Sequence, residues 1–286
     1  MILAIVSSLT IISERILFVV FPTYLIQKNF SATQIGLIFS IAGFFLIIAR
    51  TYIGKISDIL GRKGIMSIGL LISSIATVFY PLAQRIYHFV ILKGVEDTAD
   101  TLTESVETAI QADVFKKGIR AKIIGRLGSL VPFSRAIATV LGFSILTWLT
   151  IEYSFYLSAL LAFLAFLVFS IFFKEKKTTN NKFKYSLNPF KYSKVFNILV
   201  LIGFIQALTF NAAYLPGFFI LAENYLKISP QNLFILFLIS YLVSSIVVYP
   251  SGKWIDRFGR KNAVLSGVFF FNLFALFYIF TRNMFQ

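Results

Sequence analysis

The stretch GKISDILGRKG at residues 54–64 has a near copy, GKWIDRFGRKN, at residues 252–262. Gly, Lys, Asp, Gly, Arg and Lys recur at identical spacing, and each copy lies between two long apolar stretches, which indicates an internal repeat. A generic basic loop would explain the Arg and Lys but not the duplicated Gly and Asp. We expect the glycines to allow close helix approach, the Asp to meet a helix N-terminus or an Arg, and the basic pair to anchor the turn at lipid head groups. The motif residues are Gly54, Asp58, Gly61, Arg62, Lys63, Gly252, Asp256, Arg257, Gly259, Arg260 and Lys261.

The composition around the two copies is that of a membrane protein. Of 286 residues, 58% are hydrophobic and 14% are charged, whereas soluble domains are about 45–50% apolar and about 25% charged. A helix needs about 20 mainly apolar residues to cross a bilayer. The sequence therefore predicts an all-α, polytopic helix bundle with nine spans, at residues 2–26, 33–53, 65–83, 86–110, 123–150, 153–173, 197–222, 231–250 and 263–281.

The basic residues predict how these spans are oriented. Most of the 27 Lys and Arg lie in the segments that follow the second, fourth, sixth and eighth spans. By the positive-inside rule these segments and the N-terminus are cytoplasmic, in a protein of the cell membrane. Topology and contact with anionic lipid then explain the net charge of +15, so nucleic acid is not expected as a partner.

The longest polar stretch divides the chain. Residues 174–196 are rich in Lys and Asn and contain a Pro, as is typical of a linker. We therefore expect a six-helix unit at 1–173, a cytoplasmic linker at 174–196 and a three-helix unit at 197–286.

The repeated motif resembles the GxxxDRxGRR signature of the major facilitator superfamily, at both places where that family's two halves carry it. RAKIIG at 120–125 and KGVED at 93–97 are weaker echoes of family patterns, while the family's GPxxGG pattern is not visible in 123–150. The resemblance implies two halves, six helices each, that rock about a central cavity lined by helices one, four, seven and ten. It also implies that Asp58 acts on helix eleven and that Asp256 faces helix five. On this comparison we expect helices ten to twelve to be absent.

The fourth span is unusually acidic. At 100° per residue, one narrow stripe contains Lys93, Asp97, Asp100, Glu104 and Glu107, and the opposite face is apolar. Each ionised acid facing lipid would cost about 2.5–3.5 kcal/mol, so the stripe should face protein or a wet cavity.

Three interpretations of this stripe remain open. One is a ladder of ion pairs with Lys93, Arg15 and Arg135. The second is a proton or cation pathway, because carboxylates this close cannot all ionise and some should exchange protons. The third is that residues 91–115 form a surface helix, which would reverse the sidedness of everything after it.

Two other spans carry polar residues. Glu14 and Arg15 are about 100° apart on the first helix, so one can line a cavity while the other meets a neighbouring helix. In the seventh span, Gln206, Asn211 and Tyr214 precede Pro216, where a loosened helix could bind a substrate, although polar contacts between helices are about as plausible a role for them.

These observations favour a transporter over an enzyme. The sequence has no Cys, no nucleophile with a base, no cluster of metal ligands and no phosphate-binding glycine loop, so no cofactor is expected. We expect a secondary transporter that moves a small solute by alternating access, coupled to protons or another cation. The alternative is a truncated, non-transporting remnant, or a membrane interaction protein completed by a second copy or a partner chain.

Overall fold

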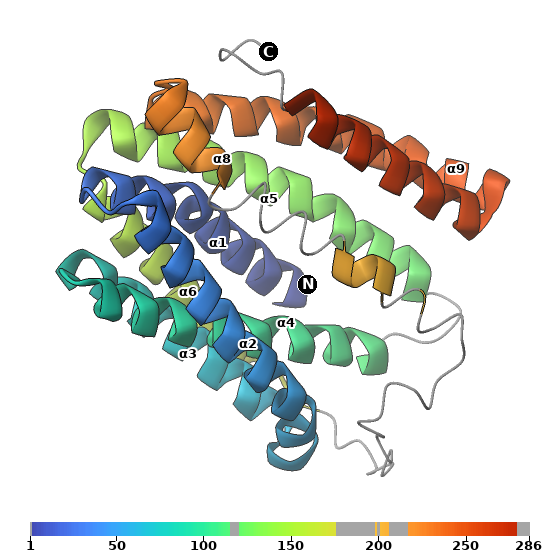
Figure 1. The fold of residues 1–286 in the computed structure, drawn as a ribbon. Helices are drawn as coiled ribbons and strands as arrows, with labels where there is room; N and C mark the ends of the chain where they lie inside the picture. The colour runs from blue at the N-terminus through green and yellow to red at the C-terminus, as the bar shows by residue number, and fades with distance from the viewer. Residues whose placement is uncertain (1, 115–119, 176–197, 199–200, 206–216, 279–286) are drawn as a thin grey trace.

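The computed structural model describes residues 2–114, 120–175, 198, 201–205 and 217–278, with side chains described except at 47–60, 111–129, 248–261, 263, 264 and 274–278. This part of the chain is helical and has no strand (Figure 1). The elements are α1 (Ile2–Gln27), α2 (Ala32–Leu60), α3 (Arg62–Phe79), η1 (Tyr80–Leu82), α4 (Ile86–Val114), α5 (Arg120–Trp148), α6 (Glu152–Phe172), α8 (Gly217–Ile220), η3 (Leu221–Tyr225) and α9 (Pro230–Tyr278).

The first six predicted spans are each confirmed as a helix in α1 to α6. α2 begins with a capping box, in which Ser31 accepts the N–H of Gln34 and Gln34 accepts the N–H of Ser31. Of the predicted seventh span, the described residues 201–205 and 217–222 are helical, while Gln206, Asn211 and Tyr214 lie outside the described residues.

The predicted eighth and ninth spans lie in one element. Helix is assigned continuously from Pro230 to Tyr278, where we expected a loop at 252–262. In Figure 1 the ribbon of α9 turns back at the right, so its dark red end returns toward the C-terminus. Gly259 is helical in α9, whereas Gly61 at the corresponding place in the first copy has φ 86° and ends α2. A glycine adopts such a φ without steric cost, and this is how the first copy ends α2.

The helices pack in a connected bundle. α1 packs on α5 and α6, α4 packs on α2 and α3, and α3 also packs on α6. α5 packs along α9, and α1 touches both α8 and α9, so the C-terminal elements join the bundle through α1 and α5 (Figure 1). The core is aromatic: the rings of Phe21, Tyr24, Tyr80, Phe89 and Phe155 contact one another.

The outer surface fits a lipid environment. Large apolar side chains such as Phe44, Phe133 and Ile171 are exposed, which a soluble surface would not present in such numbers. Within the described residues, five helical segments are long and apolar enough to cross a membrane: Ile2–Gln27, Arg62–Leu82, Leu130–Trp148, Glu152–Phe172 and Pro230–Val247. α4 is not among these five segments because it contains too many charged residues, although it packs within the bundle.

Candidate functional site

The acidic helix α4 lies within the bundle and not on its surface. Of the two surroundings open to its apolar face, neighbouring helices or lipid, the structure shows helices, with Ala99, Val106 and Ile110 each at most 2% exposed. Val106 and Ile110 pack in one cluster with Leu70 of α3 and residues of α1 and α6. This packing is that of a bundle helix, so the structure does not support the interpretation of 91–115 as a surface helix.

The first turns of the acidic stripe form an ion-pair cluster around Lys93. Its Nζ lies 3.0 Å from Glu96 and 2.9 Å from Asp97. The hydroxyl of Tyr80 also donates to Glu96, which is 3% exposed and is the most deeply buried of these acids. Lys93 Nζ further lies 5.5 Å from the ring centre of Phe21. Lys93 thus forms ion pairs with two carboxylates, and this part of the predicted series of ion pairs is present over one helical turn.

Further along α4, Asp100 faces α1 and α3. Ser73 of α3 donates to it at 2.8 Å. Asp100, Ser73 and Glu14 of α1 line a small cavity with Thr10, Ser13, Leu70, Thr103 and Ala162. About 10 Å³ of it is open to a water-sized sphere, which is about the space of one water molecule. Two carboxylates and several hydroxyls therefore meet in a protected space between α1, α3 and α4.

The last acids of the stripe differ in burial. Glu107 accepts a hydrogen bond from Ser7 of α1, which also donates to the carbonyl oxygen of Leu3 at 2.7 Å. Glu104 is exposed and acts electrostatically on Glu14. The stripe thus turns toward α1 along most of its length, as the prediction of a protein-facing or wet surface requires.

Glu14 and Arg15 separate as the helical geometry predicts. Glu14 lines the cavity beside Asp100, while the Cζ of Arg15 lies 5.4 Å from the ring centre of Phe18. Arg135 of α5 lies 5.8 Å from the ring centre of Tyr241 on α9, and both arginines act electrostatically on Tyr241. No ion pair of Arg15 with a described carboxylate is observed, so the predicted ladder does not extend to Arg15.

The first copy of the repeated motif forms a helix-to-helix turn. α2 ends at Leu60, Gly61 makes the turn, and the backbone N–H groups of Arg62 and Lys63 donate to the carboxylate of Glu175 at 2.7 and 3.3 Å. Arg62 Nη1 donates to the carbonyl oxygen of Ala109 on α4 at 2.7 Å. A carboxylate at the start of α3 satisfies free N–H groups and the helix dipole.

The remaining motif residues can be placed only by backbone. Gly54 and Asp58 lie in the last turns of α2, and Gly252, Asp256, Arg257, Gly259, Arg260 and Lys261 lie in α9, but their side chains are outside those described. The implied approach of Asp256 to helix five is compatible with the packing of α9 along α5, which is a contact between helices and not of this side chain.

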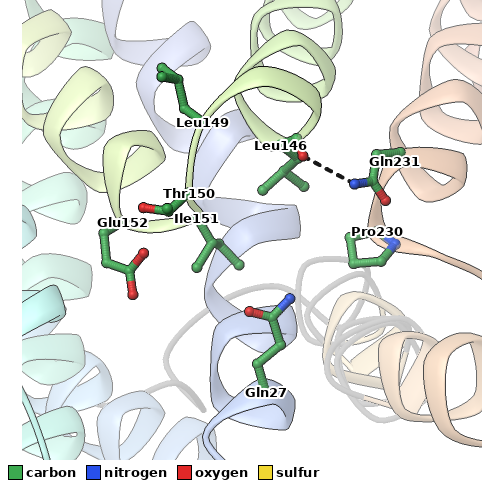
Figure 2. Close-up of a pocket in the computed structure, with 8 residues that line it drawn as sticks. All are labelled: Gln27, Leu146, Leu149, Thr150, Ile151, Glu152, Pro230 and Gln231. Carbon is green, nitrogen blue, oxygen red and sulfur yellow. Dashed lines mark hydrogen bonds between the residues drawn. The ribbon is translucent and has the colours of Figure 1, made fainter.

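A larger pocket opens at the opposite end of the bundle from Gly61. About 370 Å³ of it is open to a water-sized sphere, and its walls come from α1, α5, α6 and α9 (Figure 2). Gln231 of α9 reaches across to donate to the carbonyl oxygen of Leu146 at the end of α5, at 3.1 Å. The lining residues are Gln27, Leu146, Leu149, Thr150, Ile151, Glu152, Pro230 and Gln231. Glu152 is the charged residue of this wall.

A second contact between α1 and the C-terminal elements lies near that end. Thr23 of α1 donates to Glu223 of η3. Burial raises the pKa of Glu223 from its ordinary 4.5 to about 7. The protonated form of this carboxyl group is therefore populated near neutral pH.

Several of these residues have no signal in the sequence. Glu96 lies just off the acidic stripe, and Tyr80 lies near the end of the expected third span. Only the hydrogen bond between their side chains identifies them as part of the site. Glu175 and Glu223 lie in or next to polar segments, and Tyr241 is one of 13 tyrosines. Within the described residues, no group of three or more His, Asp or Glu side chains has the arrangement of a metal site.

Comparison with known proteins agrees with the motif. The family model described as Major Facilitator Superfamily matches residues 3–285. A comparison with curated proteins gives no match. The family consists of membrane transporters of small molecules, and the apolar helices together with the duplicated motif fit that description. This multi-pass helical membrane protein therefore belongs to the major facilitator superfamily.

Proposed function

We propose that this protein carries a small solute across the cell membrane by alternating access, and that transport is coupled to protons or another cation. The observation that carries the coupling is the cavity shared by Glu14, Asp100 and Ser73. It is lined by residues of α1, α3, α4 and α6 inside the bundle, where a carboxylate without a compensating proton or cation is costly.

Lys93 forms ion pairs with Glu96 and Asp97 but acts on Asp100 only electrostatically, as Arg15 does on Glu14. Ser73 donates a hydrogen bond to Asp100, but a hydroxyl supplies no charge. Glu14 and Asp100 act on each other electrostatically. Two like charges this close favour a state in which at least one proton is shared or exchanged, which is the requirement for a coupling site.

The helix packing supports a rocking motion of two units. We propose that residues 1–173 and 197–286 are these units, joined by the linker 174–196. α5 packs along α9, and Thr23 and Gln231 make polar contacts between the units at one end of the bundle. Such contacts are few and can exchange as the units move, which suits a shear or hinge transition.

The orientation follows from the basic residues. We propose that the end with Gly61 and Glu175 is cytoplasmic, as is the N-terminus, because the Lys and Arg of the chain are concentrated there. The pocket of Figure 2 then opens to the outside.

The test is transport in proteoliposomes with a pH-sensitive dye inside. Asp100→Asn or Glu104→Gln should abolish proton-coupled or cation-coupled movement while the protein remains in the membrane. Glu152→Gln is the matched control, because it removes a carboxylate from the pocket at the outer end and should keep the coupled signal. Unchanged coupling in both Asp100→Asn and Glu104→Gln would contradict the proposal.

A further inference from the structure

Two arginines from different helices converge on one tyrosine in the bundle interior. Arg15 comes from α1, Arg135 from α5 and Tyr241 from α9. Arg135 Cζ lies 5.8 Å from the ring centre of Tyr241, and both guanidinium groups act electrostatically on that residue. Tyr241 is buried, at 8% exposed. α9 thus completes a cluster whose charged members belong to the first six helices.

Among the described residues no carboxylate forms an ion pair with Arg15, and Glu14 acts on it only electrostatically. Its Nε is buried and has no hydrogen-bond partner, while its Cζ lies 5.4 Å from the ring centre of Phe18 and its guanidinium group interacts with Tyr241. Guanidinium stays charged at any physiological pH. A buried charge without a counter-ion is strongly disfavoured, more so in a bundle surrounded by lipid. Arg15 therefore has room for an anion in direct contact, which no described carboxylate provides.

The nearby acids have other partners. Glu96 and Asp97 pair with Lys93, Asp100 accepts from Ser73, and Glu107 accepts from Ser7. Glu14, the sequence neighbour of Arg15, lines the cavity on the α3 and α4 side. The interior is thus acidic between α1, α3 and α4 and basic between α1, α5 and α9.

We propose that Arg15, Arg135 and the hydroxyl of Tyr241 bind the anionic group, a carboxylate or a phosphate, of the solute that the protein transports. This inference rests on the proposed transport function and names its substrate class. The planar guanidinium fork fits both anions. Because α9 supplies Tyr241, an anion here would contact both proposed units, so its binding would change the balance between their arrangements.

The test is equilibrium binding to the purified protein in detergent, measured by calorimetry and by thermal stabilisation. Benzoate and succinate probe carboxylates, and glycerol 3-phosphate probes a phosphate. Benzyl alcohol, glycerol and choline are the neutral and cationic controls. At least one anion should bind and raise the unfolding temperature, and the controls should not; which anion binds identifies the group.

Variants locate the site. Arg15→Gln should weaken anion binding at least about tenfold, because a charge-assisted contact is lost, and Arg15→Lys should weaken it less. Arg135→Gln should act like Arg15→Gln. Arg85→Gln is the matched control, since Arg85 is exposed outside the cluster. Elution volume and unfolding temperature without ligand verify that each variant is folded, and Arg15→Lys keeps the test valid if Arg15→Gln does not fold.

Binding by none of the three anions would overturn the proposal, as would wild-type affinity in Arg15→Gln and Arg135→Gln. Asp100→Asn separates the two proposals, since it should retain anion binding and lose coupling. If an anion binds but Asp100→Asn and Glu104→Gln keep coupled transport, the coupling proposal is refuted and the anion-binding proposal stands.

Discussion

Glu14 and Arg15 are neighbours in sequence, but they belong to two polar clusters that differ in composition. On one side of α1, carboxylates of α4 are neutralised by Lys93 or receive hydroxyl donors from Tyr80, Ser73 and Ser7. On the other side, Arg15 and Arg135 lie against the aromatic side chains of Phe18 and Tyr241. The acidic cluster is held within α1, α3 and α4, whereas the arginine cluster is completed by α9.

This difference separates the ion pairs of Lys93, which stabilise the fold, from Arg15, while Asp100 and Glu14 belong to the coupling site proposed above. A cluster whose members satisfy one another contributes to stability and loses it when one member is removed. Arg15 forms no ion pair with a described carboxylate, so its charge contributes less to stability than that of Lys93 and is available to a ligand. The following changes test that distinction, beginning with the largest expected effect.

Lys93→Met should cause the largest loss of stability, about 3–5 kcal/mol, because it leaves Glu96 and Asp97 buried without their cation. Arg15→Met is the paired variant and should cost much less. Thermal unfolding of both proteins in the same detergent is the measurement. Equal losses would remove the contrast between the two clusters.

Gly69→Ala should destabilise by about 1–3 kcal/mol through overpacking. A Cβ at Gly69 would lie 2.8 Å from Thr103 Oγ1 and 2.9 Å from the carbonyl oxygen of Ala99, so α3 and α4 would have to separate. Gly36→Ala is the matched control, because nothing lies within 4 Å of its added Cβ. A Gly69→Ala protein as stable as Gly36→Ala would show that close approach of α3 and α4 is not required.

Tyr80→Phe should cost about 1–2 kcal/mol, since Glu96 loses a buried donor while the ring packing remains. Tyr87→Phe, at a ring that is 50% exposed, should have no measurable effect on chemical or thermal unfolding. If the two variants unfold alike, Glu96 depends on Lys93 alone.

Glu223→Gln should change how stability depends on pH. With a pKa of about 7 in the folded protein and 4.5 ordinarily, the folded state binds the proton more tightly, so this group lowers stability as pH rises from about 4.5 to about 7. Gln removes that loss, so the unfolding temperature of the variant relative to the native protein should be several degrees higher at pH 8 than at pH 5. If the difference in unfolding temperature between the variant and the native protein does not change with pH, this prediction is contradicted.

Much of the fold was predictable because it depends on local patterns. Apolar length gave α1 to α6, and the 100° step per residue predicted both the acidic stripe and the divergence of Glu14 from Arg15. A loop was expected over each motif copy, but in the first copy only Gly61 interrupts the helices and in the second Gly259 is helical, although the two glycines have similar neighbours in sequence.

Contacts between distant residues could not be predicted. Glu175 caps α3 from beyond α6, and Glu96 meets Tyr80 across the turn between α3 and α4. The family resemblance indicated which helices line a cavity, but it did not indicate that Ser73 donates a hydrogen bond to Asp100. Such pairings depend on side-chain positions that only packed helices define.

The sequence by itself determined the membrane environment, the repeated motif and the family, since apolar length, charge placement and duplication are properties of the linear chain. The tertiary structure decided that Lys93 neutralises two acids, that Asp100 and Glu14 share a cavity, and that Arg15 and Arg135 meet Tyr241. The physical reason is that a charge is balanced by whatever lies within a few ångströms in space, and in a helical bundle those neighbours come from other helices.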